Sequence, residues 1–442
     1  MWFLKFRKRS QHKECSFCHD MRENLLKPGQ GTAQKMQWAW EWQEHLRAQY
    51  HDRLIYWSLR WASRAKMNVL TIIIDGMDKV KTAWPQYHSH RKPAYLESCH
   101  RPRVVLSAVL CHGWCTNIYL TPEGVHHGGG HFCELLFRAL DSVAEIARRE
   151  KREFPQHLVI QSDNTTAQAK NSLVSNCLAY LVARGKFLTA TLNFLTVGHT
   201  HEDVDRLFSL ILVACLRRYR FEVPEDLRKS LVSCLQEHVH AKQEQLNVNM
   251  VMSIRDFDGW LKPLLITQHN CFVTRRGRLA AHSFIYKVRS DLSPAQVSDL
   301  SKLGRRVQRG FPEHPEDVFA ITKGRMYHTK TMSPVLVLPH AILNRVSDSV
   351  PKDILRQEAM KKPERENLEK LAKTLRCMPQ PYLRAARDME IMLSEAEPEQ
   401  PPAFSWLALP PPPRAAVSIT RNAYYEHLPD TSWNLVATFH RS

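Results

Sequence analysis

The chain has 442 residues, of which 43% are hydrophobic and only 15 are glycine, so it is long enough for two or three folded domains and is not a disordered polypeptide. Its 62 lysines and arginines exceed its 44 acidic residues, and the formal net charge of +18 favours a polyanionic partner, nucleic acid before an anionic membrane surface. No apolar run reaches the roughly 18 residues that a membrane-spanning helix needs. The 11 cysteines are scattered in apolar segments, which is typical of an intracellular protein without a disulfide framework.

The N-terminal residues are basic and include one cysteine motif. The run Lys5–Lys13 is of the kind that serves as a nuclear localisation signal. Cys15 and Cys18 form a Cys-x-x-Cys pair, flanked by His12 and His19. A zinc site needs four thiolate or imidazole ligands, and no second pair follows nearby. Cys15 and Cys18 are therefore candidate Zn²⁺ ligands, and the alternatives are the remnant of a longer zinc module or two ordinary cysteines.

The predicted secondary structure begins with helix and then changes to strand. Residues 34–66 lack proline and glycine and repeat aromatic or leucine side chains every three or four positions, which predicts one long amphipathic helix or two in succession. We interpret this aromatic stripe as a packing surface. Three antiparallel strands should follow, then a helix, a strand, a helix, a strand and a helix. The strands are expected at 69–75, 103–112, 115–121, 157–162 and 191–197, and the helices at 131–152, up to 183 and up to 218.

The order β-β-β-α-β-α-β-α is that of the ribonuclease-H-like fold. We therefore expect an α/β protein with such a mixed sheet, N-terminal helices and a smaller α+β C-terminal region. A helix should run from Pro224 to 243, a basic hairpin should occupy 270–289, and a short strand should follow at 334–338. The domains are expected at 1–66 (N-terminal helices), 67–245 (ribonuclease-H-like), 246–350 (basic α+β), 351–397 (charged and helical) and 398–442 (Pro-rich linker and tail).

Acidic residues stand where three of the predicted strands end. Asp75 ends the first strand, Asp163 ends the fourth, and the pair Glu202 and Asp205 comes just after the fifth. Ligand and active sites of α/β sheets form at the carboxyl ends of the strands. Each residue also has a plainer interpretation, since Asp75 can belong to an ordinary turn before Gly76 and Asp163 can be a helix N-cap. We expect the aspartates to meet at one edge of the sheet.

Carboxylates held so close repel one another, and divalent cations remove that repulsion. Two Mg²⁺ or Mn²⁺ ions, which prefer oxygen ligands, would bind Asp75, Asp163 and Asp205 and support phosphoryl transfer. Glu202 lies three residues before Asp205 and is the alternative third ligand. His199 and His201 would position a phosphate or transfer a proton, or else cap the helix at the Gly198 turn. A zinc hydrolase site built on the two histidines is disfavoured because their two-residue spacing does not place them on one helix face.

Three motifs resemble a known family. They are Asp75-Gly-Met-Asp-Lys-Val-Lys81, the Asp163-Asn164 pair with Gln168 and Lys170-Asn171, and Gly198-His-Thr-His-Glu-Asp-Val-Asp205 with Phe208-Ser209. Together they resemble the transposase-like domain-of-unknown-function family of the ribonuclease-H-like DDE/DDD transposase and integrase superfamily. The resemblance covers residues 15–243 and implies an acidic triad preceded by a cysteine-rich zinc module. Two departures are the Asn164-Thr-Thr-Ala run, which replaces a run of small residues, and a zinc module shortened to Cys15 and Cys18.

The sequence thus predicts a transposase-like protein that cleaves and transfers DNA strands with two metal ions, in the nucleus and with no membrane partner. DNA is the expected partner, and a homo-oligomer is a further candidate assembly. The residues expected to contact phosphates are Lys79, Lys81, Lys170, Arg275, Arg276 and Arg278. The alternatives are a catalytically inactive nucleic-acid-binding protein derived from a mobile element and a ribonuclease-H-fold nuclease. An exonuclease is ranked lower because Asp75-Gly-Met-Asp78 lacks the usual Asp-x-Glu spacing.

Overall fold

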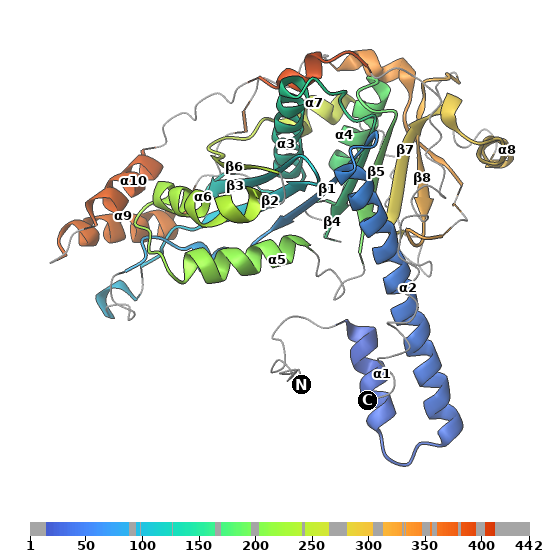
Figure 1. The fold of residues 1–442 in the computed structure, drawn as a ribbon. Coiled ribbons are helices and arrows are strands. Elements are labelled where there is room, and N and C mark those ends of the chain that lie inside the picture. Colours follow the sequence, from blue (N-terminus) through green and yellow to red (C-terminus); the bar gives the residue numbers. More distant parts are fainter. Residues whose placement is uncertain are drawn as a thin grey trace.

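The computed structural model describes residues 15–87, 94–97, 99–125, 127–163, 169–195, 203–240, 244–264, 281–303, 313–328, 331, 333–346, 354–355, 360–378, 382–394 and 403–411. A mixed sheet of nine strands lies at its centre, in the order β6-β3-β2-β1-β4-β5-β7-β8-β9 (Figure 1). The strands are β1 (Val69–Gly76), β2 (Val104–Cys111), β3 (Cys115–Pro122), β4 (His157–Ser162), β5 (Thr189–Phe194), β6 (Gln245–Met250), β7 (Ser283–Val288), β8 (Val318–Lys323) and β9 (Val335–Leu338). The expected α/β class with a mixed sheet is confirmed.

The directions of the strands follow from the connections between them. β1, β2 and β3 are antiparallel neighbours joined by short loops, whereas β4 and β5 run parallel to β1 after helical crossovers. β6 is parallel to β3 at one edge, and β7, β8 and β9 continue antiparallel from β5 to the other edge. Four strands from beyond residue 244 therefore belong to the same sheet as the first five.

The helices cover both faces of this sheet. Figure 1 shows α3, α4 and α7 over one face and α5 and α6 over the other, with α9 and α10 beyond α6. The first part of α2 and the shorter α1 project from the body as a hairpin. The helices are α1 (Ser16–Leu26), α2 (Thr32–Arg64), α3 (Gly129–Arg149), α4 (Ser172–Ala183), α5 (Asp203–Leu210), α6 (Pro224–His240), α7 (Phe257–Leu261), α8 (Pro294–Leu303), α9 (Lys362–Arg376) and α10 (Leu383–Leu393).

Alternating side chains of the central strands divide the core into two layers. In β1, Leu70, Ile72 and Ile74 pack beneath α3 and α4, whereas Ile73 packs with residues of α5 and α6. Both sets are buried, so β1 is a mainly apolar strand that is covered on both faces. Asp75 comes two residues after Ile73, and its side chain is therefore on the α5 face of the sheet.

Several local expectations differ from the structure. α4 begins at Ser172 and is capped by Asn171, whose side chain accepts a hydrogen bond from Val174 N at 3.0 Å, so Asp163 is not its N-cap. α5 is followed by a π-helical turn at Ile211–Leu216. The short strand expected at 334–338 is β9, but β8 was not predicted. The tip of the expected basic hairpin lies outside the described residues.

The Pro-rich segment near the C-terminus was expected to be a linker, and residues 403–411 correct this. They form a strap that packs on α3: Trp406 is 1% exposed and donates a hydrogen bond to the Phe137 carbonyl at 3.1 Å. Ser405 N donates to Asp141 Oδ1 at 2.8 Å, and Lys186 Nζ donates to the Leu409 carbonyl at 2.8 Å. The proline-rich composition predicted a linker, whereas Trp406 attaches this segment to α3.

We expect Trp406→Ala to lower the free energy of unfolding by about 2 kcal/mol, less than a typical core tryptophan, because the strap can detach locally and limit the loss. Urea denaturation followed by circular dichroism would measure the change. Leu407→Ala, which alters a partly buried neighbour on the same strap, is the matched control and should cost less. Equal stability of the Trp406→Ala variant and wild type would contradict a docked strap.

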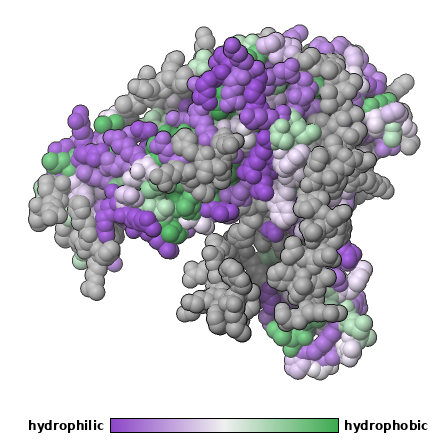
Figure 2. All heavy atoms as spheres, in the orientation of Figure 1, coloured by the Kyte–Doolittle hydropathy of each residue, from purple (hydrophilic) through white to green (hydrophobic). Residues whose placement is uncertain are grey.

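The surface is mostly polar in the view of Figure 2, with hydrophobic residues gathered along α5 and its continuation and at the α1–α2 turn. Leu26 and Met36 at that turn are 72% and 69% exposed, and Val213 beyond α5 is 49% exposed. Among the described residues, no helix combines the length and apolar character required to cross a membrane.

Candidate acidic site

Strand register brings Asp75 and Asp163 side by side. β1 and β4 are parallel, and Ile74 lies opposite Ser162, so the next residue of each chain segment is the aspartate. Neighbouring strands are about 4.8 Å apart. Asp163 comes two residues after Gln161, as Asp75 comes two residues after Ile73, and Gln161 and Ile73 lie opposite each other. Both aspartates therefore lie on the face of the sheet that α5 covers. Asp75 and Asp163 therefore lie together at the carboxyl ends of β1 and β4, the sheet edge expected from the sequence.

Asp205 approaches the same edge from α5. This helix packs against β1 and buries Val204, Leu207 and Phe208 in the layer that also contains Ile73. Asp205 itself is half-buried, as are Asp75 and Asp163. The sequence Val-Asp-Arg-Leu-Phe thus anchors the helix with its apolar side chains and leaves one carboxylate at the end of β1.

The pKa of Asp75 is affected by the charges of the other two carboxylates. Burial raises the pKa of Asp75 to about 7, against a hydrogen bond from Gly76 N at 2.8 Å that favours the ionised form. The negative charges of Asp205 and Asp163 contribute in the same direction as burial and are part of this rise to about 7. Like charges at short range disfavour one another's ionisation. A bound cation would reverse that penalty, and the donor set consists only of carboxylate oxygens, which suits Mg²⁺ or Mn²⁺.

Two buried amides extend the polar character of the site beneath the aspartates. Gln161 and Asn193 lie opposite each other on β4 and β5 and are 1% and 3% exposed. Both Gln161 amide atoms and Asn193 Oδ1 have no hydrogen-bond partner among the described residues. Buried polar atoms are nearly always satisfied by protein, water or an ion. Polar groups in need of partners thus lie on the same face as Asp75 and Asp163.

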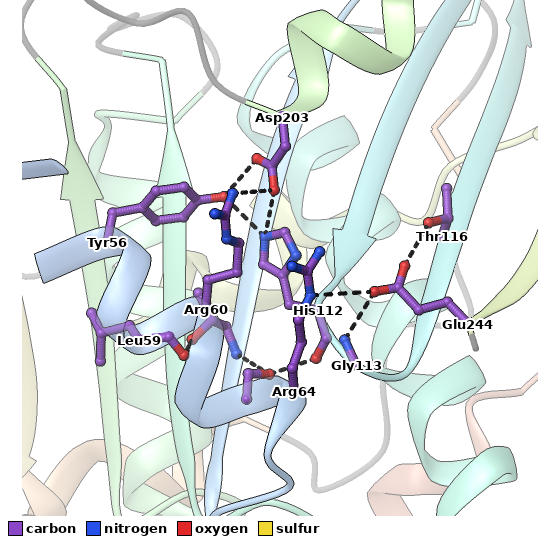
Figure 3. Close-up of polar contacts among 11 residues, drawn as sticks. Tyr56, Leu59, Arg60, Arg64, His112, Gly113, Thr116, Asp203 and Glu244 are labelled. Atoms are coloured by element: carbon purple, nitrogen blue, oxygen red, sulfur yellow. Dashed lines mark hydrogen bonds and ion pairs between the residues drawn. The ribbon is translucent and has the colours of Figure 1, made fainter. Parts of the chain in front are cut away.

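Asp203 has a different role from Asp205, although the two are only two residues apart. It belongs to a network with Tyr56 and Arg60 of α2 and His112 after β2 (Figure 3). Tyr56 Oη donates to Asp203 Oδ1 at 2.8 Å, and Arg60 donates to Oδ2 at 3.1 Å. His112 Nε2 lies 2.9 Å from Tyr56 Oη and 3.4 Å from Asp203 Oδ2.

This network fastens the start of α5 to the rest of the protein. Burial alone would raise the pKa of Asp203, but His112, Arg60 and the Tyr56 hydroxyl more than offset burial and leave the pKa lowered. Ser63 Oγ of α2 donates to the His112 carbonyl at 2.7 Å and fixes the turn between β2 and β3. Residues two apart on a helix point to nearly opposite sides. Asp203 therefore holds the helix while Asp205 faces β1.

The lysines expected to bind nucleic acid fall into two groups. Lys79 and Lys81 are exposed on the turn that follows Asp75, and Asp78 caps this turn by accepting from Val80 N at 3.1 Å. Lys170 is only 8% exposed, donates to the Ala281 carbonyl at 2.9 Å and lies 5.2 Å from the Phe194 ring centre. These contacts are those of an internal structural lysine, so we leave Lys170 out of the nucleic-acid surface.

Other expected site residues lie outside the described part of the chain. They are His199, His201, Glu202, Arg275, Arg276 and Arg278. Asp205 therefore represents the Gly-His-Thr-His-Glu-Asp-Val-Asp motif at the sheet edge, and the choice between Asp205 and Glu202 as third ligand stays open.

A second group of metal-ligand type involves the cysteine pair. Cys15 and Cys18, both buried at the start of α1, lie beside His45 of α2, and their ligand atoms are all within 4.8 Å of one another. Cys15 Sγ and His45 Nε2 are 3.5 Å apart. His45 was not predicted from the sequence, because only a second pair of ligands close to Cys15 and Cys18 was considered. A histidine on the helix that follows a Cys-x-x-Cys motif was the available signal.

Tyr56, Arg60 and His112 were also missed, since none belongs to a recognisable motif and their meeting depends on the tertiary fold. A comparison with protein-family models matches residues 95–284 to a family described as "Domain of unknown function (DUF7869)". The matched span includes Asp163 and Asp205 and begins after β1, which carries Asp75. Comparisons with curated proteins and with solved structures find no significant match.

Proposed function

We propose that the protein is a transposase-like, metal-dependent enzyme that cleaves DNA strands and transfers them, with Asp75, Asp163 and Asp205 as its metal ligands. The observation that carries this proposal is the pairing of Ile74 with Ser162, which sets Asp75 beside Asp163 on the face covered by α5. Burial is the main cause of the raised pKa of Asp75, and the charges of Asp163 and Asp205 add to it, so a cation among the three carboxylates would offset their repulsion.

The sheet supports a ribonuclease-H-like assignment for the part that carries the acids. Its central order β3-β2-β1-β4-β5, with three antiparallel strands followed by two parallel to β1, is the arrangement expected for that fold. The acids lie at the carboxyl ends of β1 and β4, where α/β sites form. Fold alone does not assign an activity, and the proposal therefore depends on the carboxylates.

The residues of the chain would share the work as follows. Asp75, Asp163 and Asp205 would hold two Mg²⁺ or Mn²⁺ ions, which when bound would activate the attacking water or hydroxyl and stabilise the leaving oxygen. Asp203, through its contacts with α2, keeps Asp205 directed at β1. Lys79 and Lys81, exposed next to Asp75, are suited to contact backbone phosphates and to orient the strand.

DNA as substrate agrees with the net charge of +18, and a nuclear location agrees with the basic run Lys5–Lys13. We further propose that Cys15, Cys18 and His45 bind Zn²⁺, because two thiolates and an imidazole select zinc over magnesium. Such a site would be structural, since it joins α1 to α2 at the projecting hairpin.

The test is nicking of labelled supercoiled and linear DNA by the full chain, with Mg²⁺, with Mn²⁺ and with EDTA. We expect cleavage with either metal and none with EDTA. A zinc chelator that spares Mg²⁺ should leave the chemistry in place if zinc is only structural. A folded chain that binds DNA in a salt-dependent manner but never nicks it with either metal would support the inactive binding protein and overturn the enzyme.

A further inference from the structure

We propose that His314, Glu316 and His340 form a zinc site at the far end of the sheet, independent of the acidic site. His314 and Glu316 precede β8, and His340 follows β9. Their ligand atoms all lie within 4.8 Å of one another, and all three side chains are half-buried. Two imidazoles and one carboxylate are a common protein ligand set for zinc when a fourth position is left for water or another ligand.

The imidazole rings of His314 and His340 both lie beside Glu316. His340 Nδ1 is buried and lies 3.2 Å from Glu316 Oε2, yet it makes no hydrogen bond with any described residue. His314 Nδ1 accepts a 3.2 Å hydrogen bond from Glu316 N, so that lone pair is engaged and Nε2 is the His314 atom that would bind a metal. A buried nitrogen beside a carboxylate, with no hydrogen bond of its own, is suited to bind a cation, and a metal held by His340 Nδ1, Glu316 Oε2 and His314 would give it a partner.

A buried aspartate holds the two segments together. Asp317 is 2% exposed, and its carboxylate accepts from His314 N through Oδ2 and from His340 N through Oδ1, each at 2.9 Å. The rings of His314 and His340 are stacked with centres 3.9 Å apart. Ligands of tetrahedral zinc are about 3.3 Å apart given Zn–N bonds near 2.0 Å. Because the two rings are nearly parallel, they must turn about their side-chain bonds before both can direct a nitrogen at one metal, while the Asp317 hydrogen bonds hold the backbone of both segments in place.

Glu316 also borders a cavity of about 290 Å³ whose walls include Asp291, Arg184 and Leu188. Neither histidine lines this cavity, so it gives access to the cluster from the Glu316 side alone. By contrast, His100 and Glu123, 2.8 Å apart, form a histidine–glutamate pair that belongs to neither metal-ligand group found among the described residues. That pair provides a control of matched chemistry.

The experiment measures zinc per chain after dialysis and zinc affinity by chelator competition, in full-length protein carrying Cys15→Ser and Cys18→Ser. This background should bind one zinc ion. Adding His340→Ala or Glu316→Gln should weaken binding at least about 100-fold, the upper range for loss of a supporting residue, whereas adding His100→Ala should leave it unchanged. Cobalt substitution should give no thiolate charge-transfer band in this background.

A folded Cys15→Ser, Cys18→Ser chain that binds no zinc would overturn the proposal. Unchanged affinity in the His340→Ala and Glu316→Gln variants would overturn it as well, since the metal would then be held elsewhere. Circular dichroism and urea denaturation of each variant exclude loss of folding as the cause. A third variant, Asp317→Asn, should weaken binding by about 10- to 100-fold through its effect on ligand position. None of these outcomes depends on whether the acidic site cleaves DNA.

Discussion

Replacing Asp75, Asp163 or Asp205 by asparagine is expected to reduce Mg²⁺-dependent DNA nicking by at least about 1000-fold, because each variant removes a proposed charged metal ligand and two-metal chemistry depends on electrostatic stabilisation. Single-turnover nicking rates with saturating protein would measure the loss. Asp78→Asn is the matched control: Asp78 is exposed, lies three residues after Asp75 and caps only the following turn. It should keep most of the activity, and full activity in all three triad variants would eliminate the proposed site.

The same substitution at Asp75 should make the metal-free protein more stable. The folded-state pKa of about 7 is above the usual value of about 3.9 for an unfolded aspartate, so the folded state binds the extra proton between these values. Wild-type stability therefore falls as the pH rises from about 4 to 7, by at most about 4 kcal/mol at 1.36 kcal/mol per pH unit. The asparagine side chain of the variant cannot ionise, so the variant should not show this fall.

Urea denaturation in EDTA at pH 5 and pH 8 would show the difference. Asp75→Asn should exceed wild type in stability at pH 8 and approach it at pH 5. Adding Mg²⁺ should stabilise wild type and leave Asp75→Asn little affected, because the cation offsets the repulsion only where the carboxylate remains. An Asp75→Asn protein that is less stable than wild type at pH 8 would show that the carboxylate is held by contacts that favour its charge.

Asp203→Ala should lower the stability of the protein, whereas Asp75→Asn should raise it in the absence of metal. It removes the acceptor of Tyr56 and Arg60 and the neighbour of His112, and leaves these polar groups without their partner. Breaking a buried ion pair by removing one member typically costs about 3 kcal/mol or more. We expect a loss of that size in the free energy of unfolding, together with reduced nicking, because the start of α5 is released.

The comparison with Asp205→Asn makes this prediction specific. Both variants should lose activity, but only Asp203→Ala should also lose stability in EDTA. Tyr56→Phe removes a single hydroxyl and should cost about 1 kcal/mol, with partial activity retained. If Asp203→Ala unfolds at the same urea concentration as wild type, the network does not hold α5. Added metal should not rescue Asp203→Ala stability to the wild-type level.

The elements that could be predicted from sequence are those with a strong period or a sharp end. The β-branched run Val69–Asp75 and the strand His157–Ser162 both form as expected, and the positions of the two aspartates at their ends follow directly. Their pairing could be anticipated only through the ribonuclease-H-like order of elements, because β2, β3 and α3 separate the two strands in the chain. Asp163 was nevertheless given an N-cap alternative, and the helix instead begins at Ser172 after Asn171.

What could not be predicted depends on contacts distant in sequence. Asp203 meets Tyr56 across 147 residues and Arg60 across 143, and nothing local to either segment indicates the partner. Lys170 carries the charge of a phosphate ligand, yet the fold encloses it between the Ala281 carbonyl and two aromatic rings. Phe404 and Trp406 are two buried aromatic residues near a run of prolines, and composition alone favoured a linker. In each case tertiary packing overrode a local signal.

The unbroken course of α2 joins two distant parts of the molecule mechanically. One helix, Thr32–Arg64, carries His45 beside the cysteine pair and Arg60 beside Asp203. Fifteen residues of α-helix separate them by about 22 Å at 1.5 Å per residue. An α-helix of this kind behaves as a rigid rod, so a partner bound at the hairpin tip would be held at a set distance and angle from the aspartates. If the chain cleaves DNA as proposed, the length of α2 would set the distance between the point of binding and the position of cleavage.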